Sequence, residues 1–163
     1  MHYQRFINGD HELSEDDLKD SLPRSLESSP MERTRNPCLH HRCIKCCLNT
    51  QMPLSNSDVA RIRRLGVSED LFVIERKGLR KLRNSMGRCI FHNGQACTIY
   101  GDRPEGCRIY PVLFDRDTKE AILDRDCSHK EEFRVTPGIS HETIRLVRRL
   151  DAQRNSRLKS KES

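Results

Sequence analysis

This chain of 163 residues contains no tryptophan, and only 5% of its residues are aromatic. Hydrophobic residues make up 34% and charged residues 33%, so only a modest apolar core can form. A core of that size commonly needs a bound metal or disulfides to offset the entropy lost on folding. The composition therefore predicts one small domain that depends on cross-links of one of these two kinds.

Long apolar runs are also missing. No segment approaches the roughly 20 apolar residues of a transmembrane helix, and residues 1–10 lack the apolar stretch of a signal peptide. These absences predict a cytoplasmic protein without a membrane partner. Because that compartment is reducing, clustered cysteines there bind metal more often than they form disulfides.

Charge and cysteine content divide the chain into three regions. Residues 1–35 carry eight acidic and five basic side chains and predict a flexible N-terminal arm. Residues 36–153 hold all the cysteines and predict a metal-binding domain, and residues 154–163 predict a basic flexible tail that frays. For the central region we expect an α+β fold, a small irregular metal-stapled domain with short hairpin strands and two or three helices.

Helix signals open the central region after residue 53. Ser55 or Ser57 should cap a helix in which Val59, Ile62 and Leu65 recur every three residues and should face the core. The arginines between them should point outward, and Gly66 should end the helix. A second short helix is expected over residues 69–74.

Strand signals dominate the second half. The Asn93-Gly94 pair accepts the positive φ of a tight turn and predicts a hairpin between residues 89–92 and 97–100. Residues 102–107 should form a turn, and the apolar stretches 109–114 and 121–123 should form paired strands. A last helix should follow residue 137, with Ile144, Val147 and Leu150 on its buried side.

The eight cysteines carry the strongest functional signal. Four lie within ten residues in the pattern C-x4-C-x2-C-C, and four are spread over the second half; all eight are candidate metal ligands: Cys38, Cys43, Cys46, Cys47, Cys89, Cys97, Cys107 and Cys127. The two residues between Cys43 and Cys46 let a tight turn aim both sulfurs at one ion. Nearby histidines are alternative nitrogen ligands: His40, His41, His92 and His129.

The spacing leaves the metal open. Adjacent side chains usually point in different directions, so Cys46 and Cys47 should not both bind the same tetrahedral zinc. The pair could serve two sites, or one member could be a structural or redox thiol. Eight thiolates could form two zinc sites of four ligands each, or one [4Fe-4S] iron–sulfur cluster with cysteines to spare.

Two arginines flank one of the later cysteines. Arg103 and Arg108 lie on either side of Cys107, where their charges would lower its pKa or tune a bound cluster. They are therefore candidate cofactor-binding residues. Salt bridges on a structural turn are the alternative role for both.

Three stretches resemble one known family. They are Cys38-Leu39-His40-His41-Arg42-Cys43-Ile44-Lys45-Cys46-Cys47, then Met52-Pro53-Leu54-Ser55 with Asp58, then Cys97-Thr98-Ile99-Tyr100 and Arg103-Pro104-Glu105-Gly106-Cys107-Arg108-Ile109-Tyr110-Pro111. Together they resemble the CxxCxxCC-type cysteine-cluster family of zinc- or iron-chelating domains, which includes YkgJ-like proteins. The resemblance covers about residues 37–129, with Cys127 where the eighth cysteine would fall. The first gap is four residues here where the family name implies two, which leaves Cys38 the least secure ligand.

The resemblance implies metal chelation and leaves the cellular role unassigned, with a metal ion as the first partner. A flagellin lysine methylase shares this cysteine pattern, so an iron–sulfur redox or protein-methylating enzyme is one alternative. The sequence has no glycine-rich nucleotide or S-adenosylmethionine loop to support it. A zinc-scaffolded nucleic-acid module is the other alternative, since residues 61–88 carry nine basic and three acidic side chains. A protein partner is compatible with every hypothesis.

Overall fold

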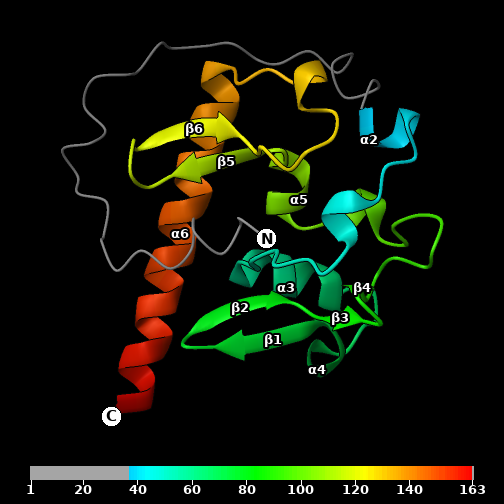
Figure 1. Ribbon diagram of the computed structural model, residues 1–163. Coiled ribbons are helices and arrows are strands. Elements are labelled where there is room, and N and C mark those ends of the chain that lie inside the picture. Colours follow the sequence, from blue (N-terminus) through cyan, green and yellow to red (C-terminus); the bar gives the residue numbers. More distant parts are fainter. Residues whose placement is uncertain (1–36, 163) are drawn as a thin grey trace.

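The computed structural model describes residues 37–162, and the expected arm over residues 1–35 lies outside them (Figure 1). The described helices are α2 (Pro37–His40), α3 (Asn56–Arg63), α4 (Glu69–Phe72), α5 (Glu105–Ile109) and α6 (Pro137–Glu162). The strands are β1 (Val73–Arg76), β2 (Leu79–Leu82), β3 (Asn84–Ser85), β4 (Arg88–Cys89), β5 (Val112–Asp115) and β6 (Glu120–Leu123), paired as three two-stranded antiparallel sheets. The α+β class is confirmed. None of the described helices meets the length and hydropathy that a membrane span requires.

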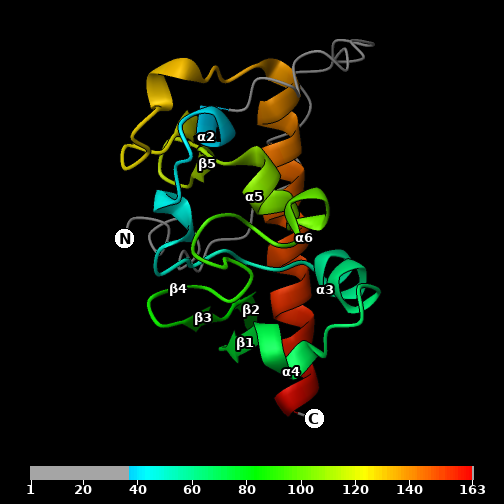
Figure 2. The ribbon, with the colours of Figure 1, turned by 90° about the vertical axis from the view of Figure 1, so that its right-hand side faces the viewer.

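Helix α6 runs along the molecule and packs against α5, β2, β5 and β6 (Figures 1 and 2). It begins at Pro137, as the sequence predicted, and Leu150 is buried as expected. The rest of the buried face is Thr143 and Leu146, while Ile144 and Val147 are only half-buried. Thr143 tolerates burial because its hydroxyl donates to the carbonyl oxygen of Ile139 at 2.7 Å.

The last turns of α6 contact the β1–β2 hairpin. The guanidinium of Arg154 donates to the carbonyl of Lys77 (3.2 Å), and that of Arg157 to the carbonyl of Gly78 (2.7 Å). The tail that was expected to fray from Arg154 onward is therefore helical as far as Glu162. Gly78 has φ +72°, and a Cβ there would lie 2.9 Å from the Arg154 carbonyl oxygen. Glycine is thus required both by the turn and by the approach of the helix.

Glu75 on β1 gives this contact a pH dependence. Its carboxylate accepts from Lys161 (2.6 Å) and Arg80 (3.2 Å), and the hydrogen bond from Lys161 is the main cause that lowers its pKa. A carboxylate whose pKa is lower in the folded state than in the unfolded state stabilises the fold at pH values above its unfolded-state pKa. This stabilisation is lost as the pH falls through the folded-state pKa.

We expect Glu75→Gln to lower the free energy of unfolding by about 0.5–1 kcal/mol at pH 7, as for an exposed ion pair. The difference from the parent protein should shrink as the pH falls below the ordinary glutamate value of 4.5. Urea denaturation at pH 7 and pH 3 measures it, with the exposed Glu142→Gln on α6 as control. An unchanged difference at pH 3 would contradict the assignment.

Helix α3 closes a first core. Ser55 caps it in a capping box with Asp58, as the sequence predicted for the cap, and Val59 and Ile62 are buried. Leu65, expected in the core, is 45% exposed because the helix ends at Arg63. The core itself consists of Met52, Leu54, Val59, Ile62, Phe72, Leu82, Cys89 and Phe91.

The hairpins differ from the expected set. The β5–β6 hairpin is confirmed, with Val112 opposite Leu123 and Asp115 opposite Glu120. The expected hairpin around Asn93-Gly94 is wrong: it is a loop with one bridge, between His92 and Cys97. The Asn93 side chain accepts from the backbone of residues 95 and 96, at 2.9 Å each, and so closes a wider turn.

Three further segments depart from expectation. The helix expected over 69–74 ends at Phe72, and Val73 begins strand β1, which pairs with β2 in a hairpin that the sequence analysis missed. The turn expected over 102–107 contains the start of α5, so Cys107 lies in a helix. Pro104 immediately precedes that helix, a position where the fixed φ of proline suits helix initiation.

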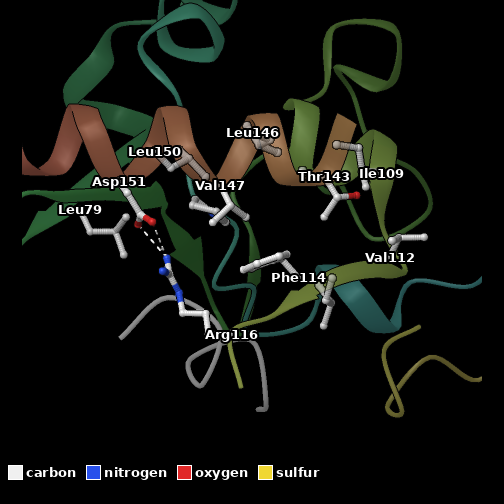
Figure 3. A pocket seen from close by; sticks show the side chains of 13 residues that line it. Leu79, Ile109, Val112, Phe114, Arg116, Thr143, Leu146, Val147, Leu150 and Asp151 are labelled. Atoms are coloured by element: carbon white, nitrogen blue, oxygen red, sulfur yellow. Dashed lines mark hydrogen bonds and ion pairs between the residues drawn. The ribbon is translucent and has the colours of Figure 1, made fainter. Parts of the chain in front are cut away.

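A second core lies between α6 and the β5–β6 hairpin. It contains Ile109, Val112, Leu146 and Leu150 and is flanked by an ion pair of Arg116 with both carboxylate oxygens of Asp151, at 2.7 and 2.9 Å (Figure 3). The cavity among these side chains has a volume of about 40 Å³. It is lined by no cysteine and is too small for a cofactor, so it belongs to the packing of the core.

Candidate metal centre

The N-terminal cysteines lie in a short, tightly bonded loop. Backbone bonds from Cys43 to the carbonyl of Cys38 (2.9 Å) and from Cys47 to that of Ile44 (2.8 Å) fold residues 38–47 into two consecutive turns. Arg42 adopts a positive φ of 50° between them. Its cysteines lie near two later segments, since the charge of Cys47 acts on Cys89 and Cys97 and that of Cys43 acts on Cys127.

One set of thiols, which we call the loop group, consists of Cys38, Cys43, Cys46 and Cys127. Burial raises the pKa of Cys38 to about 11, with further contributions from the charges of Cys43, Cys127 and Cys47. Burial also raises the pKa of Cys127, and the charge of Cys43 acts in the same direction. We place Cys46 in this group by its position in the loop; the hydrogen bond with Cys47 and burial raise its pKa most, and the charges of Cys38 and Cys107 add to the effect.

The second set, which we call the core group, consists of Cys47, Cys89, Cys97 and Cys107. Cys89 is a buried member of the first core, and the other three pack against that core. Burial raises the pKa of Cys89 to about 11, and the charges of Cys47 and Cys97 add to it. Burial likewise holds the pKa of Cys107 well above its ordinary value, with contributions from the charges of the other three thiols.

The adjacent Cys46 and Cys47 connect the two groups. Their thiols share a hydrogen bond, which raises the pKa of Cys46 and lowers that of Cys47. Cys47 affects the pKa of every other member of the core group. Burial raises the pKa of Tyr110, and the charges of Asp124, Cys127 and Cys46 act in the same direction. The charges that act on Cys46 come from both groups, from Cys47 and Cys107 as well as from Cys38.

The electrostatics of both groups favour a cation. Neighbouring thiols that raise one another's pKa are costly to ionise together, because each new thiolate repels the others. A bound metal ion removes this cost and deprotonates the thiols that coordinate it. All eight cysteines are free thiols in the structure. Their donor chemistry therefore fits zinc or iron.

The spacing of the sulfurs bears on which metal fits. Among residues 37–162, no three cysteine sulfurs lie within 4.8 Å of one another. A tetrahedral zinc ion with bonds of about 2.3 Å holds its four sulfurs about 3.8 Å apart. A [4Fe-4S] cluster binds each thiolate at a different iron and so spaces them more widely.

The two arginines beside Cys107 have different surroundings. Arg103 stacks on the Tyr100 ring, with its guanidinium carbon 3.9 Å from the ring centre, and its charge lowers the pKa of Cys97 and Cys107. Burial outweighs that effect, so both pKa values remain raised, against the expectation for Cys107. Arg108 is exposed and donates to the carbonyls of Arg103 (3.1 Å) and Gly101 (2.7 Å).

A buried carboxylate positions the helix that carries Cys107. Asp58 is fully buried, and its Oδ1 accepts from the guanidinium of Arg61 at 2.5 Å and from the backbone of Glu105 at 3.0 Å. Because Glu105 is the first residue of α5, this bond fixes the start of the helix two residues before Cys107.

Arg61 completes this connection. It was expected to point outward, yet its guanidinium donates to the carbonyl oxygens of Asp102 (3.2 Å) and Arg103 (3.1 Å). The arginine is held there because it neutralises Asp58. Its role could not be found from helical periodicity, which placed it on the solvent side.

The histidines weighed as ligands are in different settings. The ring of His92 is buried, and its Nδ1 accepts from the backbone of Gly94 at 3.1 Å, which supports the 93–96 turn. His40 is exposed at the end of α2. The rings of His41 and His129 stack on each other with centres 4.1 Å apart, and so join the loop before Cys43 to the segment after Cys127.

Comparison with known proteins gives one family match. The model of the CxxCxxCC family, described as "Putative zinc- or iron-chelating domain", matches residues 37–133. That span contains all eight cysteines and all three stretches that resemble the family, with Asp58. Searches of curated proteins and of solved structures give no match. The chain belongs to the CxxCxxCC family of zinc- or iron-chelating domains.

Proposed function

We propose that the protein is an iron–sulfur protein in which the core group holds a [4Fe-4S] cluster. The observation that carries the proposal is the placement of Cys47, Cys89, Cys97 and Cys107 around one apolar core, with sulfurs spaced more widely than a zinc ion requires. Four thiolates are the complete ligand set of such a cluster. The loop group then supplies a second thiolate site.

The surroundings support electron storage or a structural role over substrate chemistry. With four cysteine ligands, every iron of the cluster has its protein ligand, and no position is left for a substrate. Neither the cavity of Figure 3 nor the groove beside the β1–β2 hairpin is lined by a cysteine. When bound, the cluster supplies a one-electron centre whose potential depends on burial and nearby charge, and Arg103 is the nearest candidate to tune it.

The basic segment 61–88 gains no support as a nucleic-acid surface. Arg61 is used inside the fold, and Arg80 is paired with Glu69 (3.3 Å) and Glu75 (3.2 Å). Arg83 donates to the carbonyl oxygen of Asp70 at 3.0 Å. These three arginines therefore hold elements of the fold together.

Anaerobic purification followed by metal and sulfide analysis tests the proposal. We expect a brown protein with about four iron atoms and four sulfides bound to the core group. Removal of the metal under reducing conditions should lower the melting temperature, because thiolate ligation joins the two segments of the fold that carry the cysteines. A colourless protein with two zinc ions and no sulfide would overturn the iron–sulfur assignment while leaving chelation intact.

A further inference from the structure

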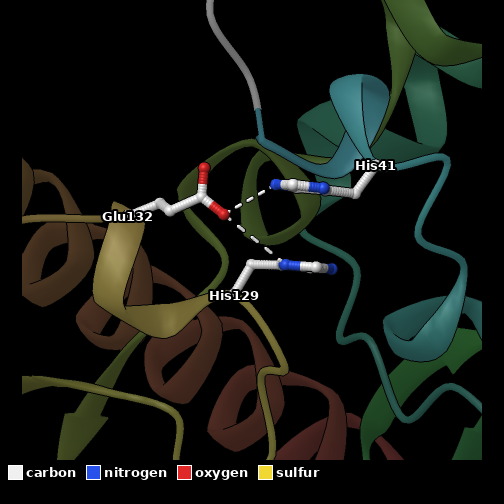
Figure 4. A group of neighbouring side chains, drawn as sticks. All are labelled: His41, His129 and Glu132. Atoms are coloured by element: carbon white, nitrogen blue, oxygen red, sulfur yellow. Dashed lines mark hydrogen bonds and ion pairs between the residues drawn. The ribbon is translucent and has the colours of Figure 1, made fainter.

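Outside the cysteine groups, one cluster of side chains has the composition of a metal site. His41 lies in the loop after α2, while His129 immediately precedes the short 3-10 helix Lys130–Glu132 and Glu132 is its last residue (Figure 4). Figure 2 shows α2 beside the 124–133 segment. The candidate donor atoms of the three residues all lie within 4.8 Å of one another.

Both imidazoles contact the same carboxylate oxygen. Oε1 of Glu132 lies 2.7 Å from Nε2 of His41 and 3.5 Å from Nδ1 of His129. Figure 4 shows both rings directed at this oxygen, and the rings are parallel to within 2°. Nitrogen and oxygen ligands bound to zinc at about 2.0–2.2 Å stand roughly 3.0–3.6 Å from one another. The separation to His129 lies within that range and the separation to His41 is about 0.3 Å below it. Because a metal–nitrogen bond lies in the plane of the imidazole, an ion also requires the two stacked rings to tilt toward each other.

We propose that His41, His129 and Glu132 bind one divalent first-row transition metal ion of the zinc class, separately from the thiolate sites. Two imidazoles and a carboxylate form a harder donor set than four thiolates, and this set favours Zn²⁺ or Fe²⁺. Three protein ligands leave at least one coordination position to solvent. The exposed fractions of the side chains, 24% for His129, 35% for His41 and 47% for Glu132, give that position access to water.

The site would also connect two parts of the metal centre. His41 is two residues from Cys43, and His129 is two residues from Cys127. An ion at this point therefore joins the same two segments that supply the loop group. Such an exchangeable, open site is the kind that binds an anionic ligand or activates water. Neither role is available to a site whose four ligands are all cysteine thiolates.

The test uses Co²⁺ as the probe on the anaerobically purified full chain, with its sulfur-bound metal as isolated. We expect one Co²⁺ per chain to bind with visible ligand-field bands and without thiolate-to-cobalt charge transfer. Glu132→Gln keeps a hydrogen-bond acceptor for both rings, yet it should weaken Co²⁺ binding at least about tenfold. Mutation of a residue that only hydrogen-bonds to a metal ligand already has an effect of that size. His41→Ala and His129→Ala should act likewise.

The control is His40→Ala, which removes the exposed neighbouring imidazole and should leave Co²⁺ affinity unchanged. Iron, zinc and sulfide contents are measured on every variant and should match the parent protein, so failure of this site is distinguishable from failure of the thiolate sites. The inference is overturned if the parent protein binds no Co²⁺, if the bound Co²⁺ shows thiolate charge transfer, or if Glu132→Gln binds it as tightly as the parent. In each of these cases the three residues form an ion pair only.

Discussion

Cys47→Ser is expected to remove the cluster from the core group, with a loss of about four iron atoms per chain. Cys47 is the one member of the loop 38–47 whose charge acts on Cys89, Cys97 and Cys107. A serine hydroxyl ionises far less readily than a thiol and is a poor ligand for iron in a cluster. Iron and sulfide analysis of the anaerobically purified variant measures the loss.

The neighbouring Cys46→Ser is the matched control, because it makes the same replacement of sulfur by oxygen at the adjacent residue. Its pKa is raised mainly by the hydrogen bond with Cys47 and by burial, and less by the charges of Cys38 and Cys107. We assign it to the loop group. This variant should retain the iron and sulfide of the core group and lose the metal of the loop group. Equal metal loss in both variants would show that the eight cysteines form one site, contrary to the division into two groups.

Asp58→Ala is expected to lower the free energy of unfolding by about 3 kcal/mol or more, as removal of one partner from a buried ion pair does. The change leaves the Arg61 guanidinium without its carboxylate and the backbone N–H of Glu105 without its acceptor. It also removes the capping box of α3. Urea denaturation of the purified protein, followed by circular dichroism, measures the change.

The same variant should bind metal at the core group less tightly, because the start of α5 is no longer fixed before Cys107. Asp117→Ala provides the control, since this aspartate is exposed in the turn between β5 and β6. It should change the unfolding free energy by no more than about 0.5 kcal/mol. A small effect of Asp58→Ala, equal to that of the control, would show that Asp58 does not hold α3 against α5.

The parts of the fold that the sequence predicted are those with local signals. The cap at Ser55, the β5–β6 hairpin and the start of α6 at Pro137 each depend on residues close together in the chain. The β1–β2 hairpin was missed because its residues, Val-Ile-Glu-Arg-Lys-Gly-Leu-Arg-Lys-Leu, are rich in charge. The charged side chains form ion pairs with residues of α4 and α6, and no local pattern reveals these partners.

The candidate site was predictable as a set of residues and not as an arrangement. Spacing alone indicated metal binding and suggested that Cys46 and Cys47 serve different partners. It could not say that Cys127 lies near Cys43, because that proximity depends on how β5, β6 and the 124–133 segment fold back. Glu132 carried no signal at all, since an exposed glutamate beside another one is ordinary in a charged chain.

The close approach of Gly78 to α6 has a consequence for cooperativity. The two cores contain different residues, and each is small. Because α6 packs on β5 at one end and lies against the β1–β2 turn at the other, separation of either core exposes part of the same helix. We therefore expect amide protons in α3 and in the β5–β6 hairpin to exchange with solvent through one shared opening reaction. A side chain at position 78 would uncouple the two halves.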